Sequence, residues 1–189
     1  MGDRRARDLQ LLDAIDALPR TQFEGTAWRI AREGRDALQG YPAGARWDPG
    51  TFDVLYTSLQ REGSLAEIHF HLSRQPVFPS KLVCVLHTLT VRTRRVLKLA
   101  DLTEAEALGV DKTRYGELAY ERTQAIGDAA YFLGFDGLMV PSARWGCQNL
   151  ILFTDQLFPE DLAIEESTTV DWAAWRSEAD ARRGHPIGD

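Results

Sequence analysis

Two arginines in the first third of the chain are candidates for binding an anion. Arg29 lies within the apolar alternation WRI, and Arg46 stands directly before Trp47 and a Pro-Gly turn. A guanidinium carries five N–H donors in a fixed fork, which matches a carboxylate or a phosphate. Two such groups near one end of a sheet could hold a pyrophosphate. Alternatively, each arginine faces solvent on its strand or pairs with a structural acid, because fully buried arginine is rare unless paired.

The sequence Tyr-Thr-Ser at residues 56–58 closes an apolar run that predicts a strand. Side chains alternate along a strand, so Tyr56 and Ser58 are expected to share one face. An aromatic ring and a hydroxyl at a strand end can stack on a flat heterocycle and bond a ribose or phosphate oxygen. The alternative is a core tyrosine followed by two turn-forming hydroxyls.

Glu67 is the one acid among apolar neighbours in the predicted helix 64–73, SLAEIHFHLS. Ser64 is a candidate N-cap, and an acid three residues later fits a capping box. In the other interpretation the Glu67 carboxylate faces the arginines and Tyr56. There it could bond ribose hydroxyls and stabilise positive charge developing at an anomeric carbon.

The segment 140–149, VPSARWGCQN, is a second unusual place. Ser142 follows a predicted strand at its edge, and Arg144 and Asn149 surround Gly146. Ser142 could donate a hydrogen bond to an anion, with backbone N–H groups of the loop adding an anion-binding nest. A tight turn between two strands explains the same residue types.

Several other kinds of site are not supported by the sequence. His69 and His71 are two apart, a spacing that does not bring them to one helix face, so a metal site is not expected. The chain has neither a glycine-rich phosphate loop nor a G-x-S-x-G nucleophile elbow. Cys84 and Cys147 lie inside separate apolar runs and are expected to be two buried, reduced thiols.

These residues must be positioned by a mixture of strands and helices. We expect helices over 5–18, 64–73, 103–109 and 115–134, and strands over 26–32, 44–48, 52–58, 82–91, 96–101, 135–144 and 148–153, followed by a polar tail with two tryptophans. The elements do not alternate strictly. The fold class is therefore α+β, with helices flanking a largely antiparallel or mixed sheet.

The composition is that of an ordinary globular chain of one domain. The 189 residues include 44% hydrophobic and 26% charged residues, with a formal net charge of −6. An acidic balance argues against a general nucleic-acid or anionic-membrane surface, although it allows a local basic pocket. No apolar run is long enough to span a membrane, and the first residues do not form a secretory signal, so a cytoplasmic location is expected.

The order of these motifs resembles that of the RES-domain family. The shared order is an arginine on an early strand, G-x-R-W, a strand ending in Tyr-Thr-Ser, a helix with Glu after Leu-Ala, Val-Pro-Ser, and Asn-Leu-Ile-Leu-Phe. The resemblance covers about residues 26 to 155. It implies a fold similar to that of ADP-ribosyltransferases. In one departure, Asp48 follows GARW where asparagine is expected.

The resemblance also implies a function. RES proteins are toxins of bacterial toxin–antitoxin pairs that degrade NAD, with members acting as NAD phosphorylases: phosphate displaces nicotinamide and leaves ADP-ribose-1″-phosphate. NAD and inorganic phosphate are then the substrates, without a metal. The implied catalytic residues are Arg46, Tyr56, Glu67 and Ser142, and the implied NAD-binding residues are Arg29, Arg46, Tyr56, Ser58 and Asn149.

In the implied mechanism the arginines hold the pyrophosphate, and Tyr56 stacks on or orients the nicotinamide ribose. Glu67 stabilises an oxocarbenium-like transition state, and Ser142 positions the attacking phosphate. Either Arg29 or Arg46 is the arginine that gives the family part of its name. An NAD glycohydrolase or a protein ADP-ribosyltransferase would use the same pocket, and a non-catalytic RES-like binding module is an alternative of another class.

The expected organisation is a helical extension over 1–25, a RES domain over 26–165, and a tail over 166–189 packed on or beside it. The family's usual partner is an Xre-type helix-turn-helix antitoxin that occludes the active site. Such a protein is the expected partner here, with direct nucleic-acid or membrane binding not expected and a homo-oligomer left open.

Overall fold

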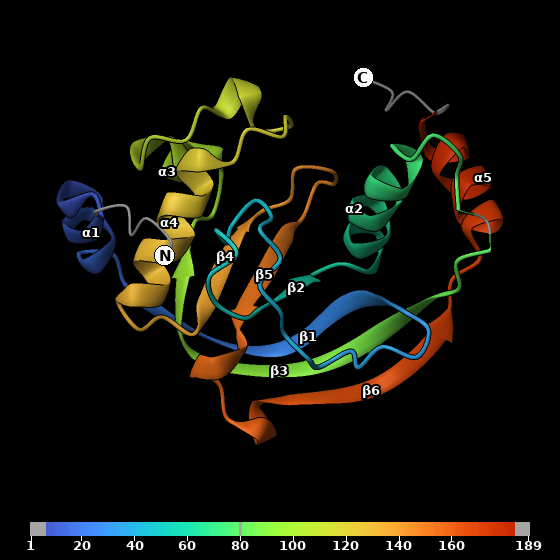
Figure 1. Ribbon diagram of the computed structural model, residues 1–189, viewed down its shortest axis with the longest axis horizontal. Helices are drawn as coiled ribbons and strands as arrows, with labels where there is room; N and C mark the ends of the chain where they lie inside the picture. Colours follow the sequence, from blue (N-terminus) through green and yellow to red (C-terminus); the bar gives the residue numbers. More distant parts are fainter. Residues whose placement is uncertain (1–6, 80, 184–189) are drawn as a thin grey trace.

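Two long antiparallel strands form the base of the structure, a computed structural model that describes residues 7–79 and 81–183 (Figure 1). They are β1, Arg20–Arg32, and β3, Cys84–Lys98, which pair along almost their whole length. β3 is rich in β-branched residues, and its middle alternates between buried and exposed positions, as expected for a strand with one face on a core.

Four shorter strands complete one mixed sheet of six strands in the order β1-β2-β5-β4-β3-β6. They are β2 Val54–Ser58, β4 Gly137–Pro141, β5 Gln148–Phe153 and β6 Leu162–Thr169. Only the β3–β4 pair is parallel. Because β1 also pairs with β3, the first five strands close into a ring, and β6 lies along the outer edge of β3.

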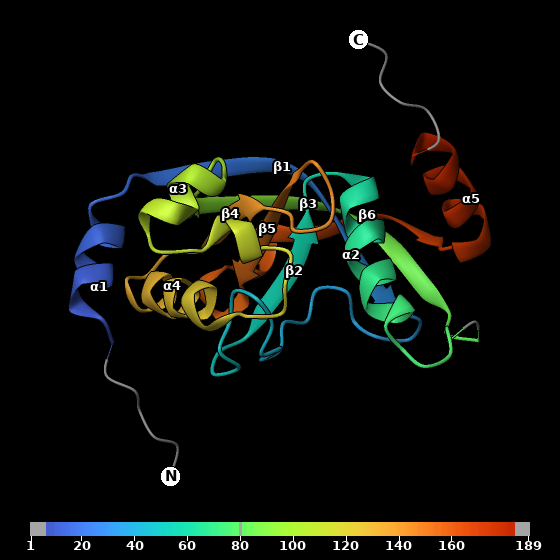
Figure 2. The same ribbon diagram turned by 90° about the horizontal axis from the view of Figure 1, so that it is seen from above.

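The helices form two groups, one at each end of the sheet (Figures 1 and 2). The α-helices are α1 Leu9–Asp16, α2 Arg61–Ser73, α3 Leu102–Ala107, α4 Glu121–Phe132 and α5 Trp172–Arg183, with short 3₁₀ turns at Lys112–Arg114, Thr154–Gln156 and Pro159–Asp161. α1, α3 and α4 pack on one end, and α2 and α5 on the other. Polar groups at the ends of β2, β4 and β5 therefore lie between the two groups. None of the described helices is long and apolar enough to cross a bilayer.

Three clusters of buried side chains hold these layers together. One fills the space between the sheet and the first helix group, and includes Leu11 and Ile15 of α1. A second lies inside the ring of strands around Leu89 and Leu150. The third joins α2 and α5 to the ends of β1 and β3, and buries Trp172 with its neighbours. Burying a large apolar side chain contributes about 1.5–3 kcal/mol, so the buried residues of α1 and α5 stabilise their packing on the sheet.

The α+β class and the mixed sheet are confirmed, but several predicted boundaries are wrong. Residues 44–48 form a turn instead of a strand, because their backbone amides bond the Asp48 carboxylate. The strands predicted over 82–91 and 96–101 are one continuous strand, since the arginines between them do not interrupt the pairing of β3 with β1. The polar run of β6 was missed because it is an edge strand with almost every side chain exposed.

Two helix starts also differ from the prediction. α2 begins at Arg61 after Gln60, which makes no side-chain cap, so Ser64 is a buried residue inside the helix and not its N-cap. α4 begins only at Glu121, because residues 115–120 form a loop in which the hydroxyl of Tyr115 donates to the carbonyl of Pro141. This loop forms one rim of the site described next.

Candidate active site

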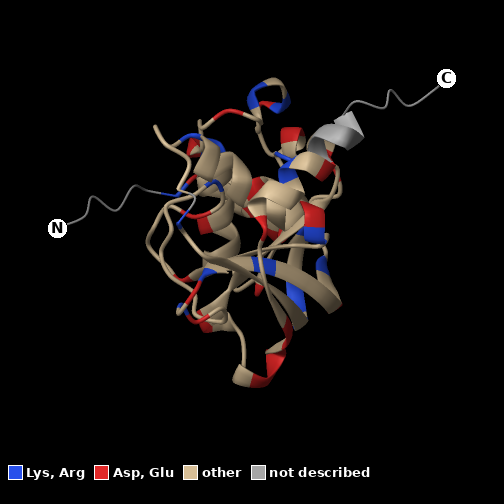
Figure 3. Cartoon of the chain, turned by 90° about the vertical axis from the view of Figure 1, so that its right-hand side faces the viewer, with Lys and Arg blue, Asp and Glu red and all other residues tan. Residues whose placement is uncertain are grey.

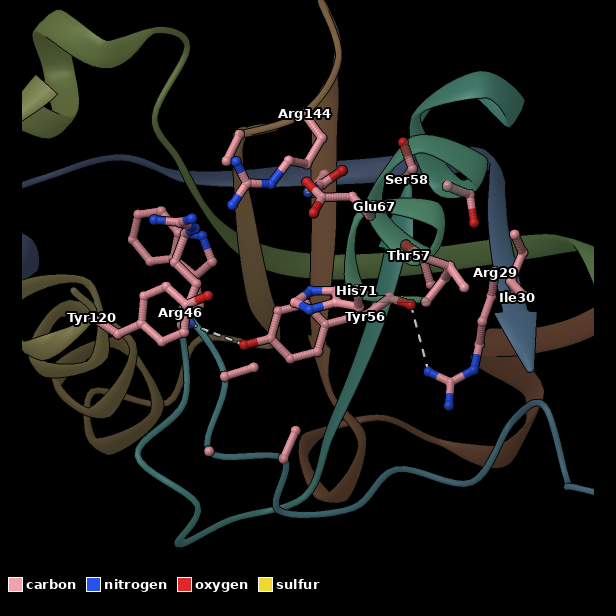
Figure 4. Close-up of a pocket in the computed structure, with 18 of the residues that line it drawn as sticks. Arg29, Ile30, Arg46, Tyr56, Thr57, Ser58, Glu67, His71, Tyr120 and Arg144 are labelled. Atoms are coloured by element: carbon pink, nitrogen blue, oxygen red, sulfur yellow. Dashed lines mark hydrogen bonds between the residues drawn. The ribbon is translucent and has the colours of Figure 1, made fainter. Parts of the chain in front are cut away.

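A cavity of about 380 Å³ opens between the two helix groups (Figure 4). This main pocket is in the size range of small-molecule sites. Its walls are the ends of β1 and β2, one side of α2, the loop 43–47, Tyr120, and the residues that join β4 to β5. Polar side chains from six separate segments thus meet around one hollow.

One stripe of α2 forms a wall of the main pocket. Ser64, Glu67, Ile68 and His71 all line it, at the i, i+3, i+4, i+7 spacing of one helix face. Gly63 lets this helix lie close to the sheet: a Cβ there would be 2.4 Å from both Cys147 Sγ and Ser58 Oγ. Because real Cβ contacts are longer than 3 Å, a larger residue would push Glu67 away from the strands.

The Glu67 carboxylate is held on one side only. Its Oε1 accepts a hydrogen bond from Ser142 Oγ at 2.7 Å and another from Asn149 Nδ2 at 3.1 Å. Its Oε2 accepts no hydrogen bond from the residues that the structure describes. A carboxylate fixed in this way keeps one oxygen available to a ligand.

Asp48 organises the loop that carries Arg46. Its carboxylate is fully buried and accepts from the backbone N–H groups of Gly44, Ala45 and Gly50, and from the Tyr56 hydroxyl at 2.8 Å. Tyr56 in turn accepts from the Trp47 N–H at 2.9 Å. Four donors converge on Asp48, so the acid is used entirely in shaping the loop. The sequence position that departs from the family pattern is thus structural in this chain.

Arg29 is a buried cation that forms no ion pair with an acid among the described residues. Only 8% of the residue is exposed, and its closest polar contact is Nη1 to the Tyr56 carbonyl at 3.4 Å. Its Nε is buried and has no hydrogen-bond partner within residues 7–79 and 81–183. Burial lowers the pKa of the Arg29 guanidinium because it disfavours the charged form. A buried guanidinium with unused donors is suited to bind an anionic ligand.

Two further guanidiniums line the pocket, and both are held by aromatic rings. Arg46 lies 4.7 and 4.8 Å from the ring centres of Tyr115 and Tyr120. Arg144 lies 3.4 Å from the ring centre of Phe70. Neither they nor Arg29 form an ion pair with a carboxylate of residues 7–79 or 81–183.

The charge of the main pocket differs from that of the whole protein. Basic and acidic residues are mixed on the face shown in Figure 3, and the net charge is −6. Yet, of the residues that the structure describes, three arginines and one carboxylate, Glu67, line the pocket. This local excess of positive charge suits a ligand with more than one negative group.

Two titrating side chains of the pocket favour their neutral forms. Burial, followed by the charges of Arg144, Arg46 and Arg74, lowers the pKa of His71, although Glu67 opposes this. Burial and the adjacent Asp48 raise the pKa of Tyr56 well above its usual value. His71 is therefore an uncharged imidazole at neutral pH, and the Tyr56 phenol keeps its proton.

The predicted site residues gather at the main pocket, but not all of them present a side chain to it. Six of them line the main pocket: Arg29, Arg46, Tyr56, Ser58, Glu67 and Asn149. Ser142 lies in the next turn and reaches the site through Glu67. The Ser58 hydroxyl is buried against Cys147 Sγ at 3.3 Å, so Ser58 forms part of the wall.

Sequence reasoning did not select His71, Tyr120 or Arg144. The i+4 spacing from Glu67 could have identified His71. Arg144 is two residues after Ser142, a signal that was visible but ambiguous. Tyr120 carried no signal, because it reaches the pocket only through the course of the loop before α4. The two histidines diverge, since His69 packs against Trp175 of α5. No group of three or more described His, Cys, Asp or Glu side chains is placed to hold a metal ion.

Comparisons with known proteins identify the family. A model of the RES domain matches residues 26–175. The chain belongs to the RES-domain family. Proteins named NAD(+) phosphorylase MbcT, from Mycobacterium bovis and Mycobacterium tuberculosis, are 31% identical to it over 179 residues, covering 90% of this chain and 96% of each relative.

The fold has a close counterpart among solved structures. A chain of the crystal structure of the M. tuberculosis MbcT–MbcA toxin–antitoxin complex superposes with a TM-score of 0.82 at 26% identity, covering 91% of this chain and 98% of that one. The match to a RES-domain toxin confirms the fold that the motif order implied. The RES model also extends to Trp175, so it includes the start of α5.

Proposed function

We propose that this RES-domain protein is an NAD-degrading toxin that cleaves the bond between nicotinamide and ribose by phosphorolysis. One observation carries the proposal: Ser142 and Asn149 fix one oxygen of Glu67 in a pocket lined by three guanidiniums. Among the described residues the other Glu67 oxygen accepts no hydrogen bond, and none of these arginines forms an ion pair with an acid. The relatives named NAD(+) phosphorylase support the same reaction.

The reaction needs little proton transfer. An oxygen of hydrogen phosphate bonds to C1″ of the nicotinamide ribose as the C1″–N bond breaks. The electron pair of that bond moves to the ring nitrogen and neutralises the pyridinium, so nicotinamide leaves uncharged. The products are nicotinamide and ADP-ribose-1″-phosphate. Electrostatic stabilisation and positioning can then supply most of the catalysis.

Glu67 and Ser142 act together in this scheme. Positive charge grows on C1″ and the ring oxygen as nicotinamide departs, and the Glu67 carboxylate stabilises it while orienting ribose hydroxyls. Ser142 donates its single hydroxyl proton to Glu67 at 2.7 Å, and Asn149 donates to the same oxygen. Both are positioning residues that fix the carboxylate before the substrate arrives.

Arg29 and Arg46 bind the pyrophosphate of NAD, and Tyr56 contacts the nicotinamide ribose. Charge-assisted hydrogen bonds from guanidiniums to phosphate are short and bidentate, and Arg29 has a buried Nε without a partner to offer. The Tyr56 hydroxyl is occupied by Asp48 and Trp47, so its ring face is the part that meets the substrate. Ser58 shapes the wall beside it.

The test is to incubate the purified protein with NAD, with and without inorganic phosphate, and to identify the products. Phosphate-dependent formation of ADP-ribose-1″-phosphate is expected. Free ADP-ribose at the same rate without phosphate would identify an NAD glycohydrolase, and labelled protein a transferase. A folded sample, free of any antitoxin, that leaves NAD intact would support a non-catalytic RES module.

An antitoxin partner belongs to the same proposal. The structural relative was solved as a toxin–antitoxin complex. We infer an Xre-type helix-turn-helix partner that covers the pocket, and the test is co-purification with the product of a neighbouring gene of that type. Restored growth and lost NAD consumption on co-expression are expected.

A further inference from the structure

The three guanidiniums of the main pocket fall into two groups. Arg29 lies on the far side of Tyr56 and Thr57 from Glu67, whereas Arg46 and Arg144 lie on the Glu67 side (Figure 4). A reaction with two phosphate-bearing substrates needs cations at two places, and the pocket offers them.

Arg144 is tied to the reactive acid through the backbone. Its N–H donates to Ser142 Oγ at 3.1 Å, and that hydroxyl donates to Glu67 at 2.7 Å. The Arg144 guanidinium stacks on Phe70, three residues after Glu67 on α2. The backbone of Arg144 is therefore linked to Glu67 through Ser142, and its guanidinium is held by a residue of the helix that carries Glu67. Its donors nevertheless have no carboxylate or carbonyl partner among the described residues.

Ser142 cannot be the main donor to an attacking phosphate in this arrangement. A hydroxyl has one proton, and that of Ser142 is used by Glu67. The same oxygen accepts from the Arg144 N–H. An attacking dianion beside the Glu67 carboxylate would be repelled unless a cation lay next to both. Arg144 is the cation that the loop places there.

A second hollow on the other side of the turn does not provide an alternative route for phosphate. It shares Pro141 and Ser142 with the site and is lined further by Trp145, Cys147 and Gln148. No Arg or Lys of the described part of the chain lines it, and it includes the acid Asp101. The anion must therefore reach C1″ from the arginine-lined side.

We propose that Arg144 is the specificity residue for the acceptor: its guanidinium binds inorganic phosphate beside Glu67 and directs the phosphate oxygen to C1″ in place of water. The inference rests on the proposed function. Arg29, on the far side of Tyr56 and Thr57, remains with the pyrophosphate, so the two anions of the reaction are held at different places in the pocket.

The test is a steady-state comparison of the wild type, Arg144→Gln and Arg144→Lys, with the concentrations of NAD and inorganic phosphate varied separately. Arg144→Gln is expected to raise KM for phosphate about tenfold or more, since a charged hydrogen bond is lost, and to change KM for NAD less than about threefold. The product ratio should shift from ADP-ribose-1″-phosphate towards ADP-ribose. Arg144→Lys keeps the charge without the planar fork and should fall between the two.

Arg74→Gln is the matched control, because Arg74 also lies over Phe70, at 5.5 Å from the ring centre, but does not line the pocket. It removes one charge near the mouth and should leave KM for phosphate within about twofold. If Arg144→Gln changes KM for phosphate no more than Arg74→Gln does, the assignment is wrong while NAD phosphorolysis stands. Phosphate-independent NAD loss by the wild type would also overturn it. A wild type without NAD consumption would overturn the proposed function and this assignment together.

Discussion

Asp48 and Glu67 are two carboxylates at the same pocket, and they differ in how their oxygens are used. Asp48 is fully buried and accepts from three backbone N–H groups and from Tyr56. Glu67 is half-buried and accepts from Ser142 and Asn149 through one oxygen only. A saturated acid stabilises the fold, because its charge is matched by fixed donors. An acid with a free oxygen can still act on a substrate.

The same distinction separates the arginines of the protein. Arg94 and Arg95 pair with the buried acids Asp161 and Asp136. The three pocket arginines have no such acid among the described residues. Counting occupied donors and acceptors therefore separates structural from functional charges here more sharply than burial does.

The largest effect is expected from Glu67→Gln. The amide keeps the shape but cannot stabilise positive charge at C1″, so kcat for NAD loss should fall about 10²–10³-fold. Thermal unfolding should change little, since few contacts are lost. Glu62→Gln, at a half-buried acid of the same helix that does not line the pocket, is the control and should retain wild-type rates. Equal activity of wild type and Glu67→Gln would remove Glu67 from the mechanism.

Asp48→Asn should chiefly reduce stability. The new amide would place an N–H group next to N–H and O–H donors that bond the carboxylate in the wild type. Each buried donor left without an acceptor costs about 1–3 kcal/mol of stability. A lower denaturant midpoint is expected, together with weaker NAD binding because the Arg46 loop loosens. If Asp48→Asn is as stable as wild type and as inactive as Glu67→Gln, the contrast between the two acids is wrong.

Ser142→Ala is expected to have an intermediate effect on catalysis. The variant removes one of the two donors that orient Glu67, so kcat should fall about tenfold, with KM for NAD almost unchanged. Because Asn149 still holds the carboxylate, Ser142→Ala should be milder than Glu67→Gln. A double variant no worse than Glu67→Gln alone would show that Ser142 acts through Glu67, and an additive loss would give it a separate role.

The smallest expected effect concerns His71 and pH. Its pKa is lowered in the folded protein, so on acidification the unfolded chain binds a proton that the folded chain does not. Stability attributable to His71 is therefore lost as the pH falls below about 6.5. Between about pH 7.5 and pH 5.5 the melting temperature of His71→Asn should fall less than that of the wild type. Identical slopes would contradict this prediction.

The sequence predicted the fold class, the family and most of the pocket, because these depend on the order of apolar runs and polar motifs. It did not predict where the pocket loop or α2 begins. The Pro49–Gly50 turn dipeptide suggests a short strand on each side of it, and only the folded chain shows that Asp48 accepts hydrogen bonds from the surrounding amides. Likewise, Glu67 fits a capping box with Ser64 locally, but α2 begins at Arg61, and Gly63 in its first turn leaves no room for a Cβ beside Ser58 and Cys147. Such contacts join residues far apart in the chain, so no local pattern contains them.

Gly127 of α4 packs against the loop that carries Arg46, on the side away from the pocket. A Cβ at this position of α4 would lie 1.8 Å from the carbonyl oxygen of Trp47, the residue after Arg46. The loop can keep its shape only while the helix presents a bare hydrogen at that point. A methyl group added at Gly127 would thus push the backbone of Trp47 away from α4. Arg46, on the pocket side of the same loop, would be displaced with it. The geometry of the main pocket therefore depends on the packing of α4 behind the loop as well as on the residues that line the pocket.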